Sequence, residues 1–302
     1  MIIDILNNIV EHFWHFFSMS APWLLLGFGL AGILKEIVPQ SVLLRLVGRN
    51  DAGGVLMAAI IGLPLPICSC GVIPTAMALH RQGATRGATV SFLIATPAIS
   101  ITAIILSSAL LGWQFTAVYM ATAFLVAVGT GLLALYLCRK EDQIDREARL
   151  ELMQEKVDLD KKSWPNKIKD ALYYGYVEML GRVSGWILLG LLISSILSVA
   201  LPSSTMVTLL GGGILTFVIM TITAMPIYIC STAAVPMMAA LVAGGAAPVG
   251  ALIFLILAPA INIATIMVAH KEMGGKTTLI YVSGLICLTI ICALIFHLLG
   301  LI

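Results

Sequence analysis

The segment Pro64-Leu-Pro-Ile-Cys68-Ser-Cys70-Gly-Val-Ile-Pro74 decides the fold, because it sets three prolines inside the long apolar stretch 53–82. Proline removes a backbone donor and clashes with the preceding helical turn, so such a cluster breaks a helix. We expect two helical pieces of about 12 residues, each too short to cross a hydrocarbon core about 30 Å thick. The segment therefore predicts a broken helix that enters the membrane and returns.

The same frame recurs as Pro226-Ile-Tyr-Ile-Cys230-Ser-Thr-Ala-Ala-Val-Pro236, at an offset of 230 − 68 = 162 residues. The alignment runs on without a gap, and 17 of the 41 positions from Pro64 to Ile104 are identical to their partners. Apolar bias does not explain paired Pro, Cys and Gly, so the chain is predicted to contain two copies of one unit. The predicted organisation is a first transmembrane repeat over 1–138, a charged cytoplasmic linker over 139–170 and a second transmembrane repeat over 171–302.

The composition indicates a membrane protein. The chain is 60% hydrophobic and 11% charged, whereas an ordinary soluble domain carries about 25% charged residues. We expect an all-α integral protein that crosses the cell (cytoplasmic) membrane several times, surrounded by the lipid bilayer. The net charge of +2 does not support a nucleic-acid partner. Four apolar segments are expected in each unit, at roughly 12–38, 53–82, 87–112, 114–138, 174–201, 209–243, 247–270 and 277–300.

The placement of Lys and Arg predicts the topology, since cytoplasmic loops are enriched in both. The linker and the loops 39–52 and 81–86 carry such residues and are expected inside, so the segment 53–82 enters and returns on one side. Three crossings and one return per unit make the repeats inverted, a recurring plan among transporters. The alternative is eight full spans with parallel repeats.

Three cysteines at the breaks are the main candidates for chemistry. Backbone groups freed at a break are costly in a membrane unless they line a cavity or bind something. If the repeats cross there, Cys68, Cys70 and Cys230 converge, and thiolates bind soft ions such as Cu(I) and Zn(II), so these are candidate metal ligands. Ser69 and Ser231 would add oxygen donors. The alternative is that the cysteines are small apolar packing residues, the interpretation we give to Cys138, Cys287 and Cys292.

Two further matched motifs, Ala95-Thr96-Pro97-Ala98-Ile99-Ser100 and Leu257-Ala258-Pro259-Ala260-Ile261-Asn262, fall in the middle of predicted single spans. A polar side chain in mid-membrane is expensive and usually has a partner or a substrate. The alternatives are therefore solute binding and hydrogen bonding between helices. The candidate substrate-binding residues are Thr96, Pro97, Ser100, Pro259 and Asn262.

Other function classes lack their usual motifs. No Asp or Glu falls in the middle of a predicted span, so a carboxylate proton relay is not visible, and no P-loop occurs. No Ser/His/Asp set or His-Glu-x-x-His motif indicates an enzyme, and no cofactor is expected. A homo-oligomer is left open.

The sequence resembles a known family at these motifs. The first frame, the following run Gly83-Ala-Thr-Arg-Gly-Ala-Thr-Val-Ser-Phe-Leu-Ile-Ala-Thr-Pro97, and the second-half pattern are similar to predicted permeases that include ArsP-type organoarsenical exporters and putative copper/zinc efflux proteins. The resemblance implies a cytoplasmic-membrane permease that exports trivalent organoarsenicals, copper or zinc. Pro97-Ala-Ile-Ser100 differs from the Pro-Gln-Thr-Gly often carried by the copper/zinc group, so the resemblance does not select among these solutes.

Three hypotheses follow from the sequence. In the first, a small inorganic or organometalloid solute binds the cysteines and is exported as one unit rocks against the other. In the second, the permease moves another small solute, such as an anion or a sulfur compound, and the cysteines are structural. In the third, the protein is a membrane scaffold without transport.

Overall fold

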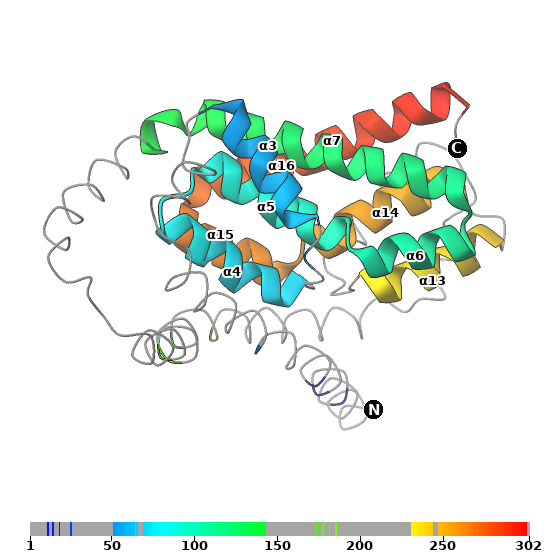
Figure 1. Cartoon of the computed structure of the whole chain (residues 1–302), viewed down its shortest axis with the longest axis horizontal. Helices are drawn as coiled ribbons and strands as arrows, with labels where there is room; N and C mark the ends of the chain where they lie inside the picture. The colour runs from blue at the N-terminus through cyan, green and yellow to red at the C-terminus, as the bar shows by residue number, and fades with distance from the viewer. Residues whose placement is uncertain are drawn as a thin grey trace, which may run out of the picture.

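The computed structural model describes residues 51–142 apart from 64 and 66–68, residues 231–300 apart from 244–246, and eight single positions elsewhere. The predicted segments 12–38 and 174–201, most of the linker, and the thiols of Cys68, Cys70 and Cys230 lie outside the described residues. Within the described part the chain is helical and contains no strand. The helices run along two directions and enclose one apolar core (Figure 1).

The stretch 53–82 forms two short helices in the structure, as the proline cluster predicts. The first, α3, runs from Ala52 to Gly62, and the second, α4, from Ser69 to Arg81. Asp51 starts α3, because its carboxylate accepts a hydrogen bond of 3.1 Å from the backbone N–H of Gly54. These helices have 11 and 13 residues, so each is about 16–20 Å long.

Two long helices correspond to the predicted spans 114–138 and 277–300. They are α7 (Trp113–Leu137) and α16 (Gly275–Leu298), with 25 and 24 residues. At 1.5 Å per residue each is about 36 Å long, which is enough to cross a bilayer core. The other described helices are α5 (Arg86–Ala98), α6 (Ile101–Leu110), α13 (Ser231–Ala243), α14 (Pro248–Ala260) and α15 (Ile263–Met273).

The stretches 87–112 and 247–270 are not the single spans that the sequence predicts. In each, a helix ends and a second begins three residues later, with bends of 46° between α5 and α6 and 50° between α14 and α15. Pro97 and Pro259 remove one N–H from the last turn before each break, and Ser100 and Asn262 then start a new helix. The prolines thus weaken the helix at the point where a capping residue restarts it.

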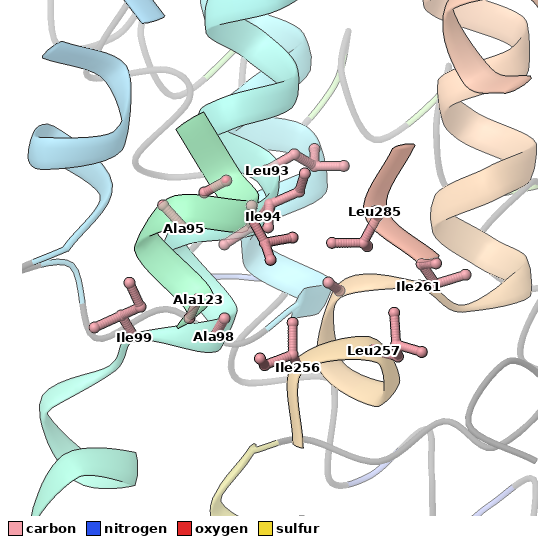
Figure 2. Packing of buried hydrophobic residues seen from close by; sticks show 14 of the residues in the cluster. Leu93, Ile94, Ala95, Ala98, Ile99, Ala123, Ile256, Leu257, Ile261 and Leu285 are labelled. Carbon is pink, nitrogen blue, oxygen red and sulfur yellow. The ribbon is translucent and has the colours of Figure 1, made fainter. Parts of the chain in front are cut away.

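The centre of the bundle consists of α5 and α14, which pack against each other and are buried along nearly their whole length. The helix α4 lies beside α15, and α6 lies beside α13 (Figure 1). Side chains that flank both breaks, among them Ala98, Ile99, Leu257 and Ile261, belong to one apolar cluster (Figure 2). Both breaks therefore lie within the core of the bundle.

The long helices α7 and α16 pack against each other in opposite directions. Cys138, just after α7, lies with its sulfur 3.5 Å from the Thr277 hydroxyl near the start of α16, while Thr130 is the nearest neighbour of Gly284 farther along. Both helices also expose large apolar side chains, the surface that lipid tails favour. These exposed residues include Leu125, Leu133, Leu137, Leu279, Ile291 and Ile295.

Candidate functional site

Ser100 and Asn262 are the N-terminal caps of α6 and α15. The Ser100 hydroxyl accepts a hydrogen bond of 3.3 Å from the backbone N–H of Ala103, and the Asn262 side-chain oxygen accepts one of 2.8 Å from that of Thr265. Asn262 also accepts a bond of 2.9 Å from the Thr265 hydroxyl. Each polar side chain thus satisfies a backbone donor that a restarted helix leaves without a partner.

Ser100 also approaches the other half of the chain. Its hydroxyl oxygen lies 3.4 Å from that of Ser231, and both residues are buried, at 5% and 7% exposure. Ser231 is the first described residue of α13 and directly follows Cys230. The structure therefore brings the first bend and the segment after Cys230 together, as the sequence hypothesis of a shared site requires for these two serines.

The remaining predicted site residues fall into three groups. Pro97 and Pro259 lie in the last turns of α5 and α14 and belong to the breaks. Thr96 is fully buried, and its hydroxyl donates to the Phe92 carbonyl at 2.9 Å within the same helix. Ser69 and Cys70 are the first two residues of α4, but their side chains lie outside the described residues, as do Cys68 and Cys230 entirely. Among the described residues no three His, Cys, Asp or Glu side chains gather into a metal-binding group.

The other cysteines stand apart from this site. Cys138 is buried at the end of α7, as expected of a packing residue. Cys292 is only partly buried and Cys287 is exposed on α16, so for Cys287 the prediction of a packing role is wrong. An apolar helix face in lipid tolerates this small, weakly polar side chain without any partner.

Tyr119 and Tyr281 were missed by the sequence reasoning. Each is fully buried, and each phenol donates a hydrogen bond to the last carbonyl before a break, Tyr119 to Ala98 and Tyr281 to Ala260. They are equivalent in the duplication, since 281 − 119 = 162. That identity was available in the sequence, because the alignment of the halves continues beyond the proline motifs.

The charged residues of the described part gather at one end of the bundle, which we call the charged end: Arg81, Arg86, Glu141, Asp142, Glu272 and Lys276. Arg81 binds Glu272 with Nη2–Oε2 and Nε–Oε2 distances of 2.5 and 2.9 Å. Lys276 Nζ lies 2.9 Å from Glu141 Oε1. Both pairs join the first half of the chain to the second, and the sequence reasoning did not find them.

Arg86 ties three helices together at the charged end. Its backbone N–H donates to both carboxylate oxygens of Asp142 at 3.1 and 3.2 Å, and its Nη1 lies 3.3 Å from Oδ1. Its Nε donates to the Met273 carbonyl of the second half at 3.4 Å. The buried Asp142 therefore compensates both the guanidinium and the N-terminal end of α5.

A helical bundle with apolar, lipid-compatible long helices, bent pairs in its centre and its charges at one end is a multi-pass membrane protein. The chain belongs to the ArsP_1 family of predicted permeases, which matches residues 5–298.

The chain is similar to a UPF0718 protein of Methanocaldococcus jannaschii, with 22% identity over 97% of this chain and 96% of that protein. A putative two-component membrane permease complex subunit of Streptococcus mutans is 23% identical over 91% of this chain and 90% of its own length. The UPF0718 protein YraQ of Escherichia coli is 23% identical over 42% of this chain and 37% of that protein. No solved structure matches the chain.

Proposed function

We propose that this permease resides in the cytoplasmic membrane and exports a thiophilic metal or metalloid, namely a trivalent organoarsenical, copper or zinc, through a site between its two halves. The observation that supports this proposal most is the buried 3.4 Å approach of Ser100 to Ser231, because it joins the first bend to the residue after Cys230. Soft ions select thiolate ligands. The proposed ligands are Cys68, Cys70 and Cys230, with oxygen donors from Ser69 and Ser231 and a path lined by Thr96, Pro97, Ser100, Pro259 and Asn262.

We further propose that the halves are inverted repeats that rock against each other. Three observations support this. The bounds of α5, α6 and α7 recur in α14, α15 and α16 at starts 162 residues later, the long helices α7 and α16 run in opposite directions, and α4–α15 and α6–α13 are equivalent pairs. Inverted halves with broken helices are a plan in which a central site opens to each side in turn.

In this cycle the charged end is the cytoplasmic side, as the enrichment of Lys and Arg in cytoplasmic loops suggests. The links from Arg81 to Glu272, from Lys276 to Glu141 and from Arg86 to the Met273 carbonyl all cross between the halves. Together they hold that end closed in the present arrangement. Opening it requires these links to break.

A second candidate is a permease for an anion or a sulfur compound with structural cysteines. It is favoured by the start of α6 and α15 inside the core, because helix N-termini carry partial positive charge and bind anions. No acidic residue lies in the first turn of α6, α13, α14 or α15. The name of the Streptococcus mutans relative adds that such a permease works as one subunit of a two-component complex, and a homo-oligomer or a scaffold role would also be seen as fixed association.

Growth of cells lacking their own exporters tests the choice between these candidates. Cells expressing the wild type are expected to tolerate one member of a panel of copper, zinc, arsenite and trivalent methylated arsenic. Cys68→Ser/Cys70→Ser should remove that tolerance, while the matched control Cys287→Ser, on the exposed face of α16, should retain it. Full tolerance of the double variant would contradict the thiolate site and favour the second candidate.

A further inference from the structure

We propose that Tyr119 and Tyr281 are paired positioning residues, each of which fixes one central bend and so sets the place of Ser100 or Asn262. The proposal deepens the proposed function, on which it rests only in taking these two capping residues to border the solute path. The carrying observation is that both phenols donate to the last carbonyl of the helix before the bend, Ala98 or Ala260.

The bends create the carbonyls that the phenols satisfy. In a continuous helix the Ala98 carbonyl would accept from the N–H four residues on, but Ile99 leaves the helical conformation with φ −117° and ψ 56°. Ile261 departs in the same way, with φ −114° and ψ 117°. An unpaired carbonyl in a water-free core is costly, so a donor at this point stabilises the bent form relative to the straight one.

The phenols connect each bend to a rigid element. Tyr119 lies on α7 and Tyr281 on α16, the two longest described helices, and both side chains are fully buried. The Ala98 carbonyl is two residues before Ser100, whose hydroxyl caps α6 and approaches Ser231. The Tyr119 bond therefore constrains the Ser100 hydroxyl relative to Ser231, whereas the Tyr281 bond acts on the other bend.

The recurrence at 162 residues provides an internal control. Tyr119 and Tyr281 have the same chemistry, the same complete burial and the same kind of acceptor. A general contribution to stability would be similar for both. A positioning effect on the contact between Ser100 and Ser231 belongs to Tyr119 alone.

The test measures disulfide formation between Ser100→Cys and Ser231→Cys in the full-length protein in membranes, with Cys68, Cys70 and Cys230 replaced by serine. Loss of one buried hydrogen bond shifts an equilibrium by about three- to tenfold. We expect Tyr119→Phe to slow oxidative cross-linking by about three- to tenfold, and Tyr281→Phe to change it by less than about twofold. Both variants keep the ring and nearly the whole volume of the side chain.

Each outcome decides the proposal. Equal slowing by the two variants, or slowing by neither, would overturn it, as would a Tyr119→Phe protein that fails to fold, since the hydroxyl would then serve the stability of the whole bundle. Transport of the panel metals with native serines is measured in parallel. Selective slowing of cross-linking in a protein that transports none of them would refute the proposed function and leave the positioning role in place.

Discussion

Arg81 and Glu272 form a two-pronged ion pair across the two halves of the chain, with the shortest N–O distance at 2.5 Å. The side chains are 24% and 10% exposed, so the pair is shielded more than a surface salt bridge. Such paired geometry gives strong charge-assisted hydrogen bonds. It is the clearest link that a rocking motion of the halves would have to break.

Reversing one charge of this pair should destabilise the closed charged end. Arg81→Glu or Glu272→Arg alone is expected to cost about 1–3 kcal/mol, because a partly buried charge then faces a like charge. The exchange variant with both substitutions should recover at least half of that loss. Thermal unfolding in detergent measures it, and a double variant as unstable as the sum of the single ones would show that the pairing contributes nothing.

Close contact between α5 and α7 predicts a second effect. A Cβ on Gly87 would lie 2.6 Å from the Gly131 carbonyl oxygen, and a Cβ on Gly131 would lie 2.6 Å from Val55 Cγ1 and 2.8 Å from Ser91 Cβ. Helices approach this closely in membranes only through small residues.

Gly87→Ala and Gly131→Ala should therefore each destabilise the bundle by about 1–3 kcal/mol through overpacking. The control is Gly53→Ala, whose Cβ would come no nearer than 3.4 Å to the Asp51 side chain. Because alanine favours a helix over glycine, we expect this control to be neutral or slightly stabilising. Equal melting temperatures for all three variants and the wild type would contradict the packing described.

The cap of α15 predicts a third effect. Asn262→Ala removes the acceptor for both the backbone N–H and the hydroxyl of Thr265, and should cost about 0.5–2 kcal/mol. Asn262→Ser, which places in the second half the residue that caps α6 in the first, should recover most of this loss. Unfolding of purified protein compares them, and an alanine variant as stable as the wild type would rule out a capping role.

Protonation of Glu141 predicts a small acid effect. A hydrogen bond from Lys276 lowers the pKa of Glu141 below its ordinary value of 4.5. A carboxyl whose pKa is lower in the folded state stabilises the fold above its unfolded-state pKa, and this contribution disappears as the pH falls through the folded-state pKa. The melting temperatures of the wild type and Glu141→Gln should thus differ slightly at pH 7 and converge below pH 4.5. A difference that persists there would exclude the carboxylate as its source.

The sequence predicts much of the fold because the signals involved are local. Prolines divide the stretch 53–82 into α3 and α4, and uninterrupted apolar runs give α7 and α16. The bends after Ala98 and Ala260 were not predicted, since Ser100 and Asn262 were read as solute or interhelical groups instead of helix caps. A cap is recognised only when the preceding helix is known to end there.

The contacts between the halves could not be read from local patterns. Arg81 and Glu272 meet because α4 and α15 end at the same side of the bundle, and Ser100 meets Ser231 because α6 lies beside α13. These pairings depend on how two similar units are oriented in space. The proposed ligands Cys68, Cys70 and Cys230 remain predictions from the sequence.

The most direct test of the proposed function is accumulation of solute by everted membrane vesicles, measured as element content. Vesicles with wild-type protein, Cys68→Ser/Cys70→Ser or Cys287→Ser are supplied with copper, zinc, arsenite or trivalent methylated arsenic. We predict that one of these solutes accumulates with the wild type and Cys287→Ser but not with the double variant. Equal accumulation with all three proteins, or accumulation of no panel member, would contradict export through a cysteine-containing site.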